Sequence, residues 1–185
     1  MMHPLGVIHG RFQVLHVDHL KYLLAGKRLC EHLVVGITNP DPELTAGEAA
    51  DPERDDPRNN PLTYWERQVM VREVLTGAGV DPGDFSVVPL PINKPERIRY
   101  YVPMDALFFL TIYDEWGRAK LRRFRALELD THVLWERPPE EKGISAGTVR
   151  EALARGEDVS SMVPPETLRL VKRWGLAQRL REIGE

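Results

Sequence analysis

The 185-residue sequence has little of what marks secreted, membrane-bound or nucleic-acid-binding proteins. Its single cysteine, Cys30, excludes an internal disulfide framework. The apolar segment at its start is far too short for a signal peptide or a membrane span. A formal net charge of -3 argues against nucleic-acid binding through bulk positive charge. We therefore expect a cytoplasmic protein that acts on a small molecule and binds neither nucleic acid nor membranes.

The composition fits one globular domain over residues 1–185. With 42% hydrophobic and 29% charged residues, the chain can bury a full core. It contains no internal repeat and no low-complexity tract. Residues 145–185 are predicted to form a helical C-terminal part, broken by glycines. Cys30 is predicted to lie on the apolar face of the first helix, as an inert core thiol.

Short apolar runs alternate with helical patterns along most of the chain. Helical periodicity follows Asp18 and Glu115, and Thr63-Tyr-Trp-Glu66 has the form of a capping box that starts another helix. The apolar runs are typical of buried strands, and they are Pro4–Ile8, His32–Ile37, Phe85–Leu90, Asp105–Thr111 and His132–Trp135. This alternation predicts an α/β fold: a Rossmann-like, doubly wound, five-stranded parallel sheet with C-terminal helices. Ligands of such sheets bind beyond the carboxyl ends of the strands.

The segment Thr38–Pro61 lacks periodicity and holds several prolines and many acids. We interpret it as a long loop. Loops of this length in compact domains are commonly functional lids. Arg54 and Arg58 favour a lid over an anion, and a solvated insertion is the alternative.

The first predicted strand leads into a loop and a helix start that together suit a phosphate. Gly10 allows close backbone approach, and the amides at a helix N-terminus attract anions. His16 and His19 are three residues apart and face the same side of that helix. They could donate hydrogen bonds to phosphate oxygens, cap the helix or fill the core, or bind a metal. A metal site would need a third ligand, which the sequence does not supply.

Four segments resemble those of one family, in the same order. Gly10-Arg-Phe-Gln with His16-x-x-His19 resembles the signature of the nucleotidyltransferases of the HxGH superfamily, in the form seen in archaeal-type nicotinamide mononucleotide adenylyltransferases. Asn60-Pro-Leu-Thr-Tyr-Trp-Glu-Arg67-Gln-Val-Met70 and Ile144-Ser-Ala-Gly-Thr-Val-Arg150 resemble two further motifs of that family. Met162-Val-Pro resembles the start of its last helix.

The resemblance implies a triphosphate site with defined residues. Arg11, His16 and His19 would contact the triphosphate, and Arg67 and Arg150 would complete the charge clamp. The remaining nucleotide contacts would come from Gly10, Phe12, Gln13, Ser145, Gly147 and Thr148. The acceptor's phosphate oxygen would attack the α-phosphorus in line and pyrophosphate would leave. Mg²⁺ would come with the phosphates of the nucleoside triphosphate, without metal ligands from the protein.

Departures from the family motif concern the substrates. Asp18 stands where the family has glycine, and Thr148 is shifted by one position. The exit of the fourth strand, Leu110–Trp116, also differs from the family's Thr-Gly-Asn. The first hypothesis is adenylyl transfer from ATP to nicotinamide or nicotinate mononucleotide. The second is cytidylyl transfer from CTP to a small phosphate or phosphonate, and the third is a non-catalytic nucleotide sensor. A homo-oligomer is possible for such enzymes.

Overall fold

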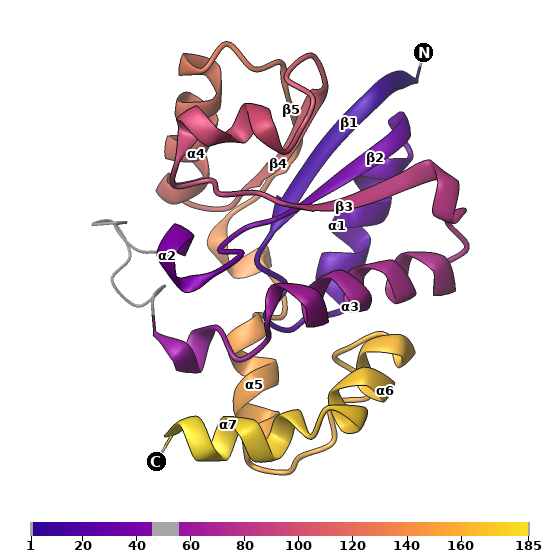
Figure 1. The fold of residues 1–185 in the computed structure, drawn as a ribbon, viewed down its shortest axis with the longest axis vertical. Coiled ribbons are helices and arrows are strands. Elements are labelled where there is room, and N and C mark those ends of the chain that lie inside the picture. Colours follow the sequence, from indigo (N-terminus) through magenta and orange to yellow (C-terminus); the bar gives the residue numbers. More distant parts are fainter. Residues whose placement is uncertain (1, 46–55, 185) are drawn as a thin grey trace.

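The computed structural model describes residues 2–45 and 56–184, and its centre is a five-stranded sheet (Figure 1). All neighbouring strands are parallel, in the order β3-β2-β1-β4-β5. The strands are β1 (His3–Gly10), β2 (Cys30–Ile37), β3 (Phe85–Pro89), β4 (Leu107–Ile112) and β5 (Thr131–Glu136). The predicted five-stranded Rossmann-like sheet is therefore confirmed.

Helices cover both faces of the sheet. One face packs against α1 (Val17–Lys27) and α3 (Tyr64–Gly77), and the other against α4 (Glu115–Ala126) and a 3-10 helix at Pro95–Tyr100. Successive residues of a strand point to opposite faces, so Ile8 of β1 belongs to the first core and Val7 to the second. The sheet is thus doubly wound.

Three helices end the chain: α5 (Ala146–Ala154), α6 (Pro165–Arg173) and α7 (Leu176–Gly184). They lie below the sheet in Figure 1, where α6 packs against α3 and α7 packs against α5. The predicted break at Gly175 separates α6 from α7, with a φ of 60° that suits glycine. The predicted capping box at Thr63 also forms, because the Thr63 hydroxyl accepts from the Glu66 amide and the Glu66 carboxylate accepts from the Thr63 amide.

Cys30 does not lie on the first helix, so that prediction is wrong. The helix ends at Lys27, and Cys30 is the first residue of β2, fully buried. It was misplaced because Gly26, the glycine nearest the boundary, lies inside the helix, and no glycine or proline stands between Lys27 and Cys30. Burial raises the pKa of its thiol to about 11, as expected for an inert core cysteine.

The long segment between β2 and α3 contains short helices at its two ends, α2 (Pro42–Thr45) and a 3-10 helix at Pro57–Asn59. Arg58 forms an exposed ion pair with Asp56. Arg54, the other arginine of the predicted lid, lies outside the described residues. In the ranges 2–45 and 56–184, no helix combines the length and apolar character needed to cross a membrane.

Candidate active site

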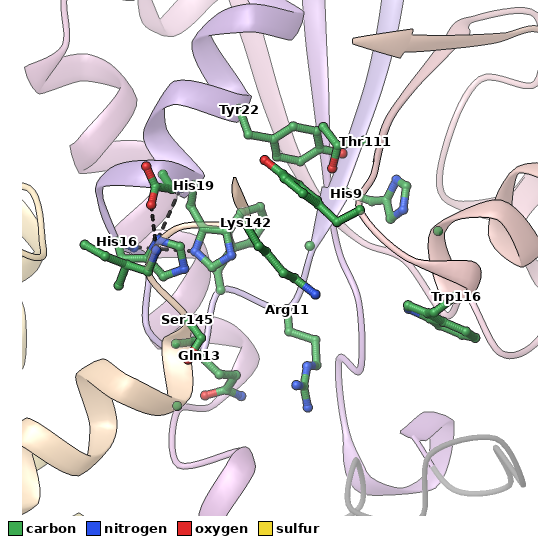
Figure 2. Close-up of a pocket in the computed structure, with 18 of the residues that line it drawn as sticks. His9, Arg11, Gln13, His16, His19, Tyr22, Thr111, Trp116, Lys142 and Ser145 are labelled. Atoms are coloured by element: carbon green, nitrogen blue, oxygen red, sulfur yellow. Dashed lines mark hydrogen bonds between the residues drawn. The ribbon is translucent and has the colours of Figure 1, made fainter. Parts of the chain in front are cut away.

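A cavity of about 490 Å³ opens at the carboxyl ends of β1 and β4. These strands are neighbours at the point where the strand order reverses, which is where ligands bind in sheets of this type. One side is formed by the loop after β1 and the start of α5, and the other by residues that follow β4 and β5 (Figure 2). Of the predicted site residues, the cavity wall includes Gly10, Arg11, Phe12, Gln13, His16, His19, Ser145, Gly147 and Arg150.

His16 and His19 form a stacked pair at the start of α1, with ring centroids 3.7 Å apart. Nδ1 of His16 accepts from the His19 amide at 3.3 Å, and Nδ1 of His19 accepts from the His16 amide at 3.4 Å. Since both Nδ1 atoms accept, each neutral ring carries its proton on Nε2. The capping alternative is therefore realised, and it also presets the tautomer that can donate to a phosphate oxygen.

The two imidazoles are neutral near pH 7. Burial lowers the pKa of His16 to about 4, against an opposing effect of the Asp18 charge. Burial, followed by the charge of His16, also lowers the pKa of His19 well below its ordinary value, while a hydrogen bond with the Val14 carbonyl acts in the opposite direction. The Nε2–H of His16 can therefore donate to a phosphate, whereas the proton of His19 is engaged by the Val14 carbonyl. The negative charge of a phosphate must be balanced by arginine and lysine.

The His16 environment predicts a pH dependence of stability. The unfolded chain binds a proton at this residue below its ordinary pKa of 6.5, and the folded chain only near pH 4. Stability is therefore complete above pH 6.5 and falls as the pH is lowered across this window. Lowering the pH from about 7 to about 5 should reduce the free energy of unfolding by about 2 kcal/mol through His16. His16→Asn, which keeps a capping side chain, should flatten this part of the curve in urea unfolding, and an unchanged slope would contradict the assignment.

The loop residues Gly10 to Gln13 are held by packing inside the protein. A Cβ on Gly10 would lie 2.8 Å from the Phe12 ring. Glycine is therefore required there because of the Phe12 ring, whereas the sequence suggested close approach of a ligand. Phe12 is fully buried against His19. The Gln13 amide exchanges two hydrogen bonds of 2.9 Å with the backbone of Leu62. Phe12 and Gln13 thus shape the loop, and their side chains are occupied within the protein.

Arg67 differs from the expectation that it completes the triphosphate clamp. Its guanidinium is buried away from the cavity wall, where it donates to the carbonyl oxygens of Arg11, Thr38 and Asn39 at 2.7–3.0 Å. These bonds tie the ends of β1 and β2 to α3. Burial, reinforced by the charge of Arg11, lowers the pKa of Arg67 to about 10. Arg67 therefore positions the Arg11 backbone, and its side chain is not part of the wall of this cavity.

Ser145 is the N-cap of α5, and its hydroxyl accepts from the Thr148 amide at 3.1 Å. Thr148 bonds the same hydroxyl and is not part of the cavity wall. Gly147 is part of the wall, in the first turn whose amides have no partner within the helix. Arg150 donates to the Gln13 carbonyl and to Asn59 Oδ1, which joins α5 to the loop after β1.

Asp18 holds the loop before α5 in place. Its Oδ2 accepts from the Ile144 amide at 2.8 Å, and its Oδ1 pairs with Lys21 at 2.7 Å. Partial burial raises the pKa of Asp18, but the hydrogen bonds from Lys21 and Ile144, with the nearby positive charges, outweigh it and the pKa is lowered. Gly143 beside it has a φ of 75°, and a Cβ there would lie 2.4 Å from Oδ2. The residue at the motif's glycine position thus connects α1 to α5 across the cavity mouth.

Asp18→Ala should lower the free energy of unfolding by about 1–2 kcal/mol, because the Ile144 amide loses a charged acceptor. It should also raise the KM for the nucleoside triphosphate, since the start of α5 is no longer held. Lys21→Ala is the matched control. The Lys21 side chain is 73% exposed, so loss of this ion pair should cost less than about 0.5 kcal/mol. Equal losses in the two variants, measured by urea unfolding, would show that the ion pair is the source of the effect.

The opposite side of the cavity contains most of the residues that the motif comparison did not select. His9 and Thr111 are the second-last residues of β1 and β4, and Lys142 follows β5, so all three lie at the edge where the sequence placed ligand contacts in general. Tyr113 and Trp116 belong to the exit of the fourth strand, which differs from the family's sequence. No specific sequence signal indicated Tyr22, Gly117, Lys120 or Trp135, which also belong to the wall. Helical spacing from the end of β4 could have indicated Lys120, which lies in the second turn of α4.

Charges on this side are predominantly basic. Asp114 is the N-cap of α4, bonded to the Gly117 amide at 2.9 Å, and it lies 3.4 Å from the Lys142 ammonium. Lys120 adds a further positive charge to the wall. Among residues 2–45 and 56–184, no group of three or more His, Cys, Asp or Glu side chains is arranged to hold a metal. The cavity therefore suits anionic ligands on both sides.

Comparison with known proteins agrees with this geometry. The chain is 52% identical over 176 residues, 95% of each chain, to phosphonoformate cytidylyltransferase of Streptomyces viridochromogenes. It is 24% identical over 182 residues, 95% of this chain and 92% of the other, to the nicotinamide-nucleotide adenylyltransferase of Methanolobus tindarius. No protein-family model matches the chain.

A solved structure has the same fold. The bifunctional NMN adenylyltransferase/ADP ribose pyrophosphatase of Francisella tularensis, complexed with AMP and a manganese ion, aligns with a TM-score of 0.72 at 16% identity. The alignment covers 98% of this chain and 52% of that structure, so the chain spans about half of its length. At this identity the likeness concerns the fold alone. The extensive match to the Streptomyces enzyme shows that the chain is an enzyme and belongs to the nucleotidyltransferases of the HxGH superfamily.

Proposed function

We propose that this protein transfers the cytidylyl group of CTP to a small phosphonate that carries a carboxylate, with phosphonoformate as the first acceptor to test. The observation that carries the proposal is the match over nearly the whole chain to the Streptomyces cytidylyltransferase. The cavity supports it, because basic side chains of both halves suit a small, strongly anionic acceptor beside a triphosphate. This choice reverses the order of the first two hypotheses from the sequence.

The reaction needs no covalent enzyme intermediate. A phosphonate oxygen of the acceptor attacks the α-phosphorus of CTP, the new P–O bond forms, and the bond to pyrophosphate breaks in line. Arg11 and the Nε2–H of His16, both from the cavity wall, would stabilise the charge that grows on the α-phosphate oxygens. The amides at the start of α5, including that of Gly147, offer further donors to the polyphosphate.

We infer that Mg²⁺ accompanies the triphosphate. The acidic side chains of the wall, Asp18 and Asp114, are each paired with a lysine and a backbone amide. A cation held by phosphate oxygens and water fits this arrangement, since Mg²⁺ typically keeps several waters and binds substrate phosphates. When bound, it would neutralise charge on the departing pyrophosphate.

The proposal is tested by offering the purified protein each of the four nucleoside triphosphates with phosphonoformate, nicotinamide mononucleotide or nicotinate mononucleotide. Pyrophosphate release is the readout. We expect CTP with phosphonoformate to give the highest kcat/KM. A higher value for ATP with either mononucleotide would replace the proposal with adenylyl transfer. Nucleotide binding without pyrophosphate release in any pairing would indicate a sensor.

A further inference from the structure

His9 is a buried histidine without a hydrogen-bond partner among residues 2–45 and 56–184. It is the second-last residue of β1, its exposed fraction is 5%, and neither Nδ1 nor Nε2 is bonded to any described residue. Buried polar atoms without partners are uncommon, because their lost hydration is not replaced. His9 also belongs to the wall of the active-site cavity. A ligand in that cavity could supply the missing partner.

The position of His9 separates it from the phosphate-binding residues. Figure 2 shows it on the Trp116 side of the cavity, away from the His16 and His19 pair. Its ring packs against Phe124 of the second core, with centroids 5.3 Å apart, and this contact fixes its orientation. His9 therefore lies in the half of the cavity that remains for the acceptor when the triphosphate occupies the loop after β1 and the start of α5.

His9 is neutral, and its positive neighbour is Lys120. Burial lowers the pKa of His9 well below its ordinary value, and the charge of Lys120 lowers it further. A neutral imidazole offers one N–H donor without a charge. Lys120 belongs to the same wall and supplies the charge that the imidazole lacks. Together they suit a carboxylate, which accepts through two oxygens and carries one negative charge.

We propose that His9 and Lys120 form a subsite for the carboxylate of the acceptor and thereby determine acceptor specificity. This inference rests on the proposed function and goes beyond it, since it assigns the second anionic group of the acceptor to named residues. His9 and Arg11 are two residues apart, so their Cα atoms are at most about 7 Å from one another. An acceptor of a few heavy atoms can therefore reach the subsite while its phosphonate lies beside the phosphate-binding loop.

A subsite of this kind discriminates between acceptors with and without a carboxylate, because an acceptor that lacks the carboxylate leaves the subsite empty. An acceptor without the carboxylate leaves the buried N–H of His9 unpaired, as it is in the free protein, and so gains less binding energy. Sites built to bond a polar group reject analogues that lack it far more strongly than apolar pockets reject analogues of different size. The wild-type enzyme should therefore prefer phosphonoformate to methylphosphonate.

The test measures kcat/KM for phosphonoformate and for methylphosphonate, with CTP saturating, in wild type and His9→Phe. Phenylalanine preserves the packing against Phe124 and removes both nitrogens. We expect kcat/KM for phosphonoformate to fall roughly 10- to 100-fold, as for a lost hydrogen bond to a charged group. The value for methylphosphonate and the KM for CTP should stay within about 3-fold of wild type, a change worth less than one hydrogen bond. The preference between the acceptors should therefore collapse.

Three further variants complete the test. Lys120→Gln, at a partly exposed position, should reduce the same preference even if His9→Phe is poorly folded, and Lys120→Arg should restore part of it. His32→Gln is the control histidine, bonded to Ser86 outside the cavity, and should leave the preference unchanged. Equal losses for both acceptors, or an undiminished preference in His9→Phe and Lys120→Gln, would overturn the subsite alone. Absence of turnover with CTP and every phosphonate in wild type would overturn the proposed function, and the subsite with it.

Discussion

Arg11→Met is expected to lower kcat roughly 100- to 1,000-fold, the loss typical of one removed transition-state donor. Arg11 belongs to the cavity wall beside His16 and His19, and its charge is felt by the buried guanidiniums of Arg67 and Arg150, whose pKa values it helps to lower. A cation kept among other cations at the end of β1 is suited to polyphosphate. The measurement is single-turnover pyrophosphate release with saturating substrates.

Measuring the free energy of unfolding of Arg11→Met distinguishes a loss of catalysis from a loss of folded protein. The protein relies on the backbone of Arg11, whose carbonyl accepts from Arg67 at 3.0 Å, and methionine keeps that carbonyl. The free energy of unfolding should therefore stay within about 1 kcal/mol of wild type, as for most substitutions away from the core. Arg155→Met, which removes an exposed arginine paired with Glu157, is the control and should retain full activity. Parallel loss of stability and activity in Arg11→Met would contradict the catalytic assignment.

Arg67→Met should have its largest effect on stability. The substitution leaves the carbonyls of Thr38 and Asn39 buried without their donors, and each lost partner of this kind costs about 1–3 kcal/mol. Unfolding in urea should show a loss of about 3 kcal/mol or more. Activity should also fall, because the Arg11 carbonyl and the end of β1 are released.

A second substitution shows whether geometry or charge is responsible. Arg67→Lys keeps the charge but replaces the planar guanidinium, which reaches several carbonyls at once, by a single ammonium. It should therefore recover only part of the lost stability. If Arg67→Met were as stable as wild type and only raised the KM for CTP, Arg67 would bind the triphosphate directly, as the motif comparison implied.

The fold follows from local signals that tertiary packing did not override. Apolar runs between helix starts such as Thr63 and Ser145 located the strands and helices, because capping and strand burial depend on residues close in sequence. The boundary between the first helix and β2 was missed at Cys30, where no glycine or proline marks the end of the helix. Termination there depends on the packing of β2 beside β1, which a local pattern does not contain.

The location of the site could be predicted from the sequence, but the roles of its individual residues could be predicted only in part. Motifs brought Arg11 and His16 to one cavity, but the same motifs include Arg67, which donates to backbone carbonyls. A sequence does not distinguish an arginine that faces a ligand from one that bonds the backbone, because both are polar residues at regular spacing in a helix. Lys120 reaches the cavity through the placement of α4 on the sheet, which is a tertiary feature.

The proposed reaction joins the cytidylyl group of CTP to the phosphonate of a small acceptor in this cavity. Phosphorus NMR of the purified protein with CTP, Mg²⁺ and phosphonoformate identifies the bond that forms. We expect free pyrophosphate together with two coupled resonances from a phosphonate joined to CMP through oxygen. Unchanged CTP in this mixture, with formation of a dinucleotide from ATP and nicotinamide mononucleotide under the same conditions, would contradict it.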